Sequence, residues 1–476
     1  MTGRQEERKR LEKCFESKHS EFVAVYGRRR VGKTYLVKEQ FKDRFLFWHT
    51  GLSPYDRDRK NLLQDQLHAF YVNLLRYGLK KGAQPSSWLD AFALLALLVE
   101  NKKGPGKKVI FIDEMPWMDT ARSRFIPAFE HFWNDWAAKR DDILLIVCGS
   151  ATSWIEDNLI HNKGGLYGRL TEKIHLHPFT LKESREFYLS KGVKMSDYDL
   201  AQSYMIVGGI PYYMAAFDSS CSLAQNIDRL FFAEDAALED EFDLLMGSLF
   251  VNPEQYKSIL RFLSNRHGGY TREEIVSGTG IADGGGLTKQ LKALIASQFI
   301  EKYIPFGKGG NDTCYRLCDY FCRFWITFME KKKVKDPKYW ENNIQSSALA
   351  AWRGFAFEDL CVQHVLRIKQ ALGVEGVAST QSAWCLPGDD SQEGSQIDLV
   401  IDRADNVVNL CEMKFYADDF RVSKEYAKKL GGRVAAIQEI IPRRKVVHLT
   451  LVTTYGVVGN EYSGIFQKIV TLEDLF

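Results

Sequence analysis

The sequence predicts an α/β protein in its first half, followed by smaller domains. Short, nearly continuous apolar runs at 21–27, 45–50, 108–114, 144–150 and 172–179 alternate with stretches of helical periodicity. Apolar runs separated by helices are typical of a parallel sheet that helices cover on both faces, because such strands are buried on both sides. The 476 residues exceed one ordinary core. We therefore expect roughly two to four domains.

Composition and charge narrow the class of protein. Hydrophobic residues make up 45% and charged residues 26% of the chain, as in soluble globular proteins. The net charge of +3 is too small to give the whole molecule a strong electrostatic attraction to nucleic acid or to an acidic membrane surface. The nine cysteines lack the spacing of a disulfide framework. No apolar run is long enough to span a membrane and no signal-peptide core is visible, so we expect a cytoplasmic protein without a membrane partner.

The first apolar run ends in a phosphate-binding motif of the form G-x-x-x-x-G-K-[ST]. Glycines let the backbone curl so that successive N–H groups point at phosphate oxygens, and the following helix adds its positive end. Lysine can reach the β- and γ-phosphates, and the threonine hydroxyl can bind Mg²⁺. The sequence therefore predicts an ATP or ADP site with Mg²⁺ in a P-loop NTPase sheet. The residues concerned are Gly27, Arg28, Arg29, Arg30, Val31, Gly32, Lys33 and Thr34.

Two acidic residues follow the third apolar run, in "KVIFIDE". Asp113 lies at the end of a predicted buried strand, and Glu114 is its neighbour. Hydrolysis of ATP needs one carboxylate for the metal and one for the attacking water. We expect Asp113 to hold Mg²⁺, directly or through water, and Glu114 to orient the water. The predicted reaction is ATP hydrolysis.

Several segments together resemble a known family. They are "GRQEERKRLEK", "AVYGRRRVGKTYL", "IFIDEMPWM", "IVCGSATSWI", "GGLYGRLTEKIHLHPFT" and "MIVGGIPYYM". In order and spacing they resemble archaeal and bacterial AAA+-related ATPases of the STAND group. The resemblance covers most of the chain and implies the remaining roles at the nucleotide.

The resemblance assigns four roles. Ser150 matches the polar sensor beside the γ-phosphate, and Arg169 matches an arginine that senses or stabilises the phosphates. Whether Arg169 serves its own nucleotide or that of a neighbour in a homo-oligomer is open. Gly209 and Pro211 lie in a motif that closes as a lid, and Arg4 matches a segment against the adenine.

Beyond the strands, the pattern suggests further domains. The predicted division is an ATPase core at 1–180, a helical lid at 181–250, a winged helix-turn-helix at 251–330, a charged linker at 331–347 and a nuclease-like domain at 348–476. Three helices and two strands around a glycine-rich turn predict the winged helix. Such a module binds DNA or joins domains. Its third helix carries few basic residues, so both interpretations stay open.

The C-terminal region contains a second candidate site. "QIDLVID" and "LCEMKF" predict a hairpin in which Asp398 lies opposite or nearly opposite Glu412, with Lys414 on the same face. This is the D…ExK arrangement of PD-(D/E)xK nucleases, and "GFAFEDL" offers Glu358 as an additional acid. The carboxylates of Glu358, Asp398 and Glu412 suit Mg²⁺ or Mn²⁺, and Lys414 suits a developing negative charge. The family that the chain resembles has a nuclease-like C-terminal domain.

Three functions are consistent with these patterns. In the first, ATP binding moves the lid and winged helix and gates a metal-dependent nuclease that acts on DNA or RNA. In the second, an ATP-switched regulator or scaffold binds nucleic acid or a protein partner without cleavage. In the third, a plain ATPase carries an inert tail.

Overall fold

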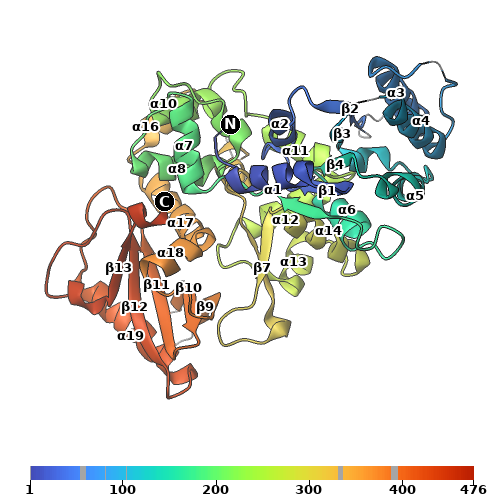
Figure 1. Ribbon diagram of the computed structural model, residues 1–476. Coiled ribbons are helices and arrows are strands. Elements are labelled where there is room, and N and C mark those ends of the chain that lie inside the picture. Colours follow the sequence, from blue (N-terminus) through green and yellow to red (C-terminus); the bar gives the residue numbers. More distant parts are fainter. Residues whose placement is uncertain (1, 54–60, 81, 103, 331–335, 387–394) are drawn as a thin grey trace. The chain divides into compact units, whose positions relative to one another are not determined.

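The computed structural model describes residues 2–53, 61–80, 82–102, 104–330, 336–386 and 395–476 (Figure 1). The chain divides into two compact units. The first comprises Met1–Pro178, Asp243–Pro253 and Lys292–Ser297, and the second comprises Phe179–Phe242, Glu254–Leu291 and Gln298–Phe476. The finer division into five segments stays a prediction.

A five-stranded parallel sheet forms the centre of the first unit, with the order β2-β3-β4-β1-β5. The predicted α/β class is therefore confirmed. The last strand ends at His175, earlier than the apolar run 172–179 suggests, because the chain soon reaches Pro178, which cannot donate a ladder hydrogen bond. The strands are β1 (Glu21–Tyr26), β2 (Phe45–Thr50), β3 (Lys108–Asp113), β4 (Ile143–Gly149) and β5 (Glu172–His175).

Amphipathic helices pack on this sheet and bury a largely aromatic core. Phe47 of the sheet contacts Phe70, and Phe70 contacts Trp88 and Phe92, all of them buried. The helix that begins at Trp88 has a capping box, because Ser87 and Asp90 satisfy each other's backbone N–H groups. The helices are α1 (Gln5–Glu16), α2 (Lys33–Gln40), α3 (Leu62–Arg76), α4 (Trp88–Asn101), α5 (Phe125–His131), α6 (Thr152–Ile155) and α11 (Glu241–Leu249).

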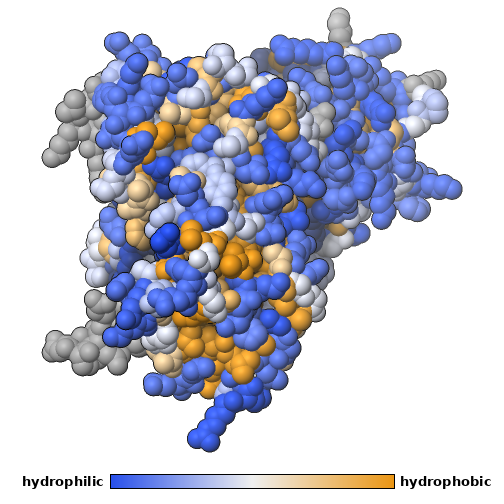
Figure 2. All heavy atoms as spheres, turned by 90° about the vertical axis from the view of Figure 1, so that its left-hand side faces the viewer, coloured by the Kyte–Doolittle hydropathy of each residue, from blue (hydrophilic) through white to orange (hydrophobic). Residues whose placement is uncertain are grey.

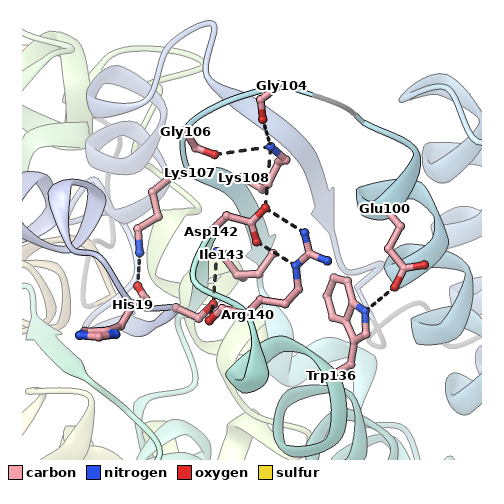
Figure 3. Close-up of polar contacts among 11 residues, drawn as sticks. His19, Glu100, Gly104, Gly106, Lys107, Lys108, Trp136, Arg140, Asp142 and Ile143 are labelled. Carbon is pink, nitrogen blue, oxygen red and sulfur yellow. Dashed lines mark hydrogen bonds and ion pairs between the residues drawn. The ribbon is translucent and has the colours of Figure 1, made fainter.

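Polar contacts join the beginnings of three strands at the amino end of this sheet (Figure 3). The Arg140 guanidinium donates two hydrogen bonds of 2.8 Å to Asp142, and the Lys108 ammonium lies 3.8 Å from the same carboxylate. Ser20 donates to the Arg140 carbonyl at 2.7 Å and accepts from the Ile143 N–H at 3.3 Å. These contacts hold β1, β3 and β4 in register at one edge. The residues predicted to bind nucleotide lie at the opposite, carboxyl edge.

The second unit begins with helices and a small antiparallel sheet of order β6-β8-β7. The three helices and hairpin predicted for 253–330 are all present, although α14 continues into the first unit. Their identity as a winged helix stays a prediction. The elements are α7 (Leu181–Ser190), α8 (Asp197–Val207), α9 (Pro211–Met214), α10 (Leu223–Ile227), α12 (Pro253–Leu263), β6 (Tyr270–Thr271), α13 (Arg272–Thr279), α14 (Gly285–Ala296), β7 (Ile300–Tyr303) and β8 (Cys314–Leu317).

A mixed five-stranded sheet of order β13-β12-β11-β10-β9 completes the second unit. Strands β9, β10 and β11 are antiparallel, whereas β11, β12 and β13 are parallel. The elements are α15 (Tyr320–Phe324), α16 (Tyr339–Asn343), α17 (Ser347–Gln363), α18 (Val365–Ala371), β9 (Ser379–Leu386), β10 (Ser395–Arg403), β11 (Val407–Lys414), α19 (Lys424–Ile440), β12 (Val446–Thr453) and β13 (Lys468–Thr471).

The predicted charged linker at 331–347 contains the short helix α16, and residues 331–335 lie outside the described ranges. Trp340 is buried, and the backbone N–H groups of Trp340 and Glu341 donate to the Asp228 carboxylate at 2.7 and 3.0 Å. The described part of this segment is therefore packed into the second unit, because its aromatic residues outweigh its charges.

The surface in Figure 2 is mostly hydrophilic, with separate apolar patches. Single exposed apolar residues are ordinary for a globular protein. Within the described ranges, none of the helices combines the length and the apolar character needed to cross a bilayer.

Candidate nucleotide site and C-terminal acidic cluster

The phosphate loop joins β1 to α2 at the carboxyl edge of the parallel sheet. Gly27 has φ of 139°, and a Cβ atom there would lie 2.3 Å from the Leu176 carbonyl oxygen. Gly32 has φ of 91° and is the N-cap of α2, which begins at Lys33. Glycine is therefore required twice, by close backbone approach at Gly27 and by left-handed backbone at Gly32. The loop leads directly into a helix N-terminus, which favours phosphate.

Backbone carbonyl groups of the loop hold the side chain of Lys33. Its ammonium donates to the carbonyl oxygens of Gly27 and Arg28, at 2.8 Å in both cases. Burial lowers the pKa of Lys33, and the nearby charges of Glu114 and Asp113 act in the opposite direction. The lysine is thus placed within the loop that its motif predicts, with acidic groups near it.

The residues expected to bind Mg²⁺ lie side by side. The Thr34 hydroxyl donates at 2.9 Å to Oδ2 of Asp113, the last residue of β3. Burial raises the pKa of Asp113, and the charge of Glu114 raises it further, so a cation there would favour the ionised form. Hydroxyl and carboxylate oxygens are the ligands that Mg²⁺ prefers. Thr34 and Asp113 therefore fit the predicted ion.

Glu114 adopts left-handed backbone, with φ of 47°, and its side chain meets the end of β4. The Ser150 hydroxyl donates to Glu114 Oε1 at 2.6 Å, and the Ser150 backbone N–H donates to Oε2 at 3.0 Å. The family resemblance places Ser150 beside the γ-phosphate. The structure adds that Ser150 fixes the orientation of Glu114.

The arginines of the loop differ in their surroundings. Arg28 is buried, whereas the Arg29 guanidinium lies 5.7 Å from the Trp117 ring and Arg30 has φ of 74°. Their position favours a role in the loop and its immediate surroundings. Val31, which belongs to the loop, is also buried.

Arg4 connects the start of the chain to the phosphate loop. Its guanidinium donates to the carbonyl oxygens of His177 at 2.5 Å and Val31 at 3.4 Å, and the residue is buried. Arg4 therefore lies against the loop in the first unit. A contact with adenine stays a prediction.

Three further residues, Arg169, Gly209 and Pro211, were predicted to lie at the nucleotide. Arg169 is exposed and follows Gly168, whose φ is 66°. Gly209 and Pro211 belong to the second unit, where the Gly209 carbonyl accepts from the Phe179 N–H at 2.8 Å and Pro211 starts α9. Their roles as phosphate sensor and lid stay predictions.

The hairpin of the C-terminal sheet brings the predicted acids near each other. The antiparallel pairs run from Asp402–Val408 to Leu399–Cys411, so Asp398 and Glu412 adjoin the last pair, one on each strand. Burial raises the pKa of Asp398, and the charge of Glu412 raises it further. Burial also raises the pKa of Glu358, on α17, to about 9, with a further contribution from Asp398. Glu358, Asp398 and Glu412 therefore share one acidic region.

Both oxygens of the Glu412 carboxylate already have protein donors. The Tyr426 hydroxyl donates to Oε2 at 2.7 Å, and the Arg433 guanidinium forms an ion pair with Oε1. The Lys414 ammonium lies 5.2 Å from the centre of the Tyr426 ring. Sequence reasoning missed Tyr426 and Arg433. Both residues lie on α19, and no local sequence pattern relates this helix to Glu412.

The acidic region does not form a metal site as its side chains stand. Within the ranges that the structure describes, no group of three or more His, Cys, Asp or Glu side chains could hold a metal ion. Asp398 accepts from the Gln396 amide at 2.6 Å, so this acid is also engaged. Carboxylates suit a divalent cation, but Tyr426 and Arg433 already occupy both oxygens of the Glu412 carboxylate.

Comparison with known proteins agrees with the fold of the first unit. Residues 1–217 match the model of an ATPase domain predominantly from Archaea. The chain is 27% identical over 332 residues to the uncharacterized protein MJECL04 of Methanocaldococcus jannaschii, which is 69% of each chain.

Two solved structures are similar. One is the Walker-type ATPase PABY2304 of Pyrococcus abyssi, at 18% identity and a TM-score of 0.50, covering 69% of this chain and 96% of that one. The other is the ORC2 protein of Aeropyrum pernix, at 14% identity and a TM-score of 0.40, covering 73% and 96%. The first likeness shows the fold alone. The motif, the loop geometry and the family match over residues 1–217 together support an ATPase domain in this part of the chain.

Proposed function

We propose that the first unit hydrolyses ATP with Mg²⁺ and that residues of the phosphate loop bind the phosphates and the ion. The observation that carries this proposal is the hydrogen bond between Thr34 and Asp113 at the end of the loop Gly27–Thr34, with Glu114 adjacent. Backbone N–H groups of the loop and the ammonium of Lys33 bind the phosphates. Thr34 and Asp113 hold the ion, which supplies positive charge to the phosphate oxygens.

Glu114 acts on the water that attacks the terminal phosphate. Its carboxylate accepts the water's hydrogen bond and aligns the oxygen with the phosphorus. Ser150 keeps that carboxylate from rotating, since it donates to both oxygens. Arg169 is the group proposed to stabilise the phosphates, in its own chain or in a neighbouring chain of a homo-oligomer. A STAND-type assignment within the AAA+-related ATPases is part of the same proposal.

Steady-state hydrolysis of ATP tests this part. The Asp113→Asn variant keeps the hydrogen-bonding shape and removes the charge, so we expect a loss of at least about 100-fold in kcat. Asp141→Asn, which changes an exposed aspartate of the same unit, is the matched control and should keep parental turnover. Equal rates for wild type and Asp113→Asn would contradict the assignment.

For the second unit, the proposal is that nucleotide state acts through the lid at 181–250 and the winged helix at 251–330 on the nuclease-like domain at 348–476. The supporting observation is the hairpin, in which Asp398 and Glu412 adjoin the Leu399–Cys411 pair, with Lys414 two residues beyond Glu412. DNA or RNA is the proposed substrate. The test is cleavage of each in Mg²⁺ or Mn²⁺ by wild type and by Glu412→Ala. Cleavage that survives Glu412→Ala would remove this site from the proposal.

A second candidate function is an ATP-switched regulator or scaffold that binds DNA or a protein partner without cutting. The ion pair of Glu412 with Arg433 and its hydrogen bond with Tyr426 favour it, because they occupy the carboxylate. Nucleic-acid binding without cleavage in either metal would select this candidate.

A further inference from the structure

The Glu412 carboxylate has a cation within the protein. Arg433 is 14% exposed and Glu412 only 7%, so the pair lies just beneath the surface of the second unit. Tyr426 donates to the other carboxylate oxygen at 2.7 Å. A carboxylate bound in this way has its charge compensated and its two oxygens directed at protein donors. A divalent metal would have to displace these donors to bind Glu412.

The other acids nearby increase the need for a cation. Asp398 and Glu412 adjoin the Leu399–Cys411 pair of the hairpin, one on each strand. Removing Arg433 would leave the buried Glu412 carboxylate without its ion-pair partner, which is unfavourable unless another cation takes its place. Arg433 and a metal ion therefore compete for the same negative charge.

Arg433 also has a second class of partner within reach. It lies on α19 two turns after Tyr426, and Leu430 of the same helix is buried in the core. Lys429, one turn before it, is exposed, and Lys414 lies at the end of β11. A guanidinium is well suited to phosphate, which it binds through two parallel hydrogen bonds.

We propose that Arg433 is an internal cation that keeps Glu412 from binding metal, and that a nucleic-acid phosphate withdraws Arg433 and so opens the site to a divalent ion. This deepens, and rests on, the proposed action of 348–476 on nucleic acid. Metal binding at Glu412 is then conditional on substrate. It also explains why the acids are brought together and yet form no metal site.

Binding of Mn²⁺ to the full chain without nucleotide tests the competition directly, with free Mn²⁺ measured by electron paramagnetic resonance. Arg433→Met should raise Mn²⁺ affinity roughly 10–100-fold over wild type. Adding Glu412→Gln to Arg433→Met should remove the gain. Lys428→Met, an exposed change on the same helix, should leave the affinity at the wild-type value. Equal affinity in wild type and Arg433→Met would overturn the proposal.

A second measurement needs no substitution and so stands even where Arg433→Met does not fold. A short DNA duplex should raise the Mn²⁺ affinity of wild type by a similar factor. DNA that binds wild type without changing its Mn²⁺ affinity would overturn the proposal. The same would follow from DNA that fails to bind at all.

The outcomes separate this inference from the proposed nuclease activity. Enhanced Mn²⁺ binding by Arg433→Met without any cleavage would preserve the competition and reject the nuclease. Metal-dependent cleavage by wild type, with Mn²⁺ affinity insensitive to Arg433→Met and to DNA, would preserve the nuclease and reject the competition.

Discussion

Ser150 holds both oxygens of the Glu114 carboxylate, through its hydroxyl at 2.6 Å and its backbone N–H at 3.0 Å. The two residues directly follow the ends of the neighbouring strands β3 and β4. Because two donors fix a carboxylate in both position and plane, Ser150 determines how Glu114 meets an attacking water. Ser150 is therefore a positioning residue in the proposed reaction.

Ser150→Ala removes the hydroxyl and keeps the backbone donor. We expect kcat for ATP to fall about tenfold with little change in KM, since one hydrogen bond to the carboxylate is lost. The same change in a Glu114→Gln background should have almost no further effect, because the two residues act as one unit. Fully additive losses in the double variant would show that Ser150 acts independently of Glu114.

Glu114→Gln should bind ATP but fail to turn it over. The amide keeps the shape of the side chain and loses the charge that orients water, so we expect a fall of roughly 100- to 1,000-fold in kcat. Single-turnover experiments should find ATP, and not ADP, on the protein. Parental turnover by this variant would contradict the role of Glu114.

Gly27→Ala should destabilise the first unit. A Cβ atom at this position would lie 2.3 Å from the Leu176 carbonyl oxygen, and φ is 139°. Strain of this kind costs about 1–3 kcal/mol, and the shifted loop should also lose nucleotide affinity. Gly247→Ala, at a helical glycine of the same unit with open space around it, is the control and should not destabilise. Urea unfolding followed by tryptophan fluorescence compares the two.

His49 should make the first unit less stable in acid. Burial lowers its pKa to about 4, and the Asn73 amide donates to Nδ1 at 2.8 Å, so the folded state favours neutral imidazole. An unfolded histidine titrates near pH 6.5. Between these values unfolding takes up a proton, so the free energy of unfolding falls by roughly 1 kcal/mol for each pH unit below 6.5.

The variant His49→Gln, which keeps an acceptor for Asn73, should lose the share of the pH dependence that His49 contributes, while His175 and His177, whose pKa values burial also lowers, keep theirs. His19→Gln, at an exposed position, should retain it. The measurement is urea unfolding between pH 7 and pH 5. An unchanged slope in His49→Gln would refute the assignment.

The local parts of the nucleotide site were predictable from sequence. Gly27, Gly32 and Lys33 lie within one turn between a strand and a helix, so their spacing alone specifies the chemistry. The contact between Ser150 and Glu114 depends on the pairing of β3 with β4, which joins residues far apart in the chain. Periodicity does not report such pairings, so the sequence placed Ser150 only through family resemblance.

The C-terminal site shows the same division. The proximity of Asp398 and Glu412 in the chain fold depends on a short hairpin, and the sequence predicted that hairpin. Arg433 comes from a helix that follows the hairpin and folds back on it. Its long side chain reaches Glu412 only after α19 has packed on the sheet, so no local pattern announced the ion pair.

The central claim is that the loop Gly27–Thr34 binds a nucleoside triphosphate. Equilibrium titration of the folded chain with a fluorescent ATP analogue and Mg²⁺ tests it most directly. We predict saturable binding by wild type and by Lys38→Ala, an exposed change on the same helix, and its loss in Lys33→Ala. Saturation by folded Lys33→Ala with the wild-type affinity, or none by folded wild type, would contradict the account.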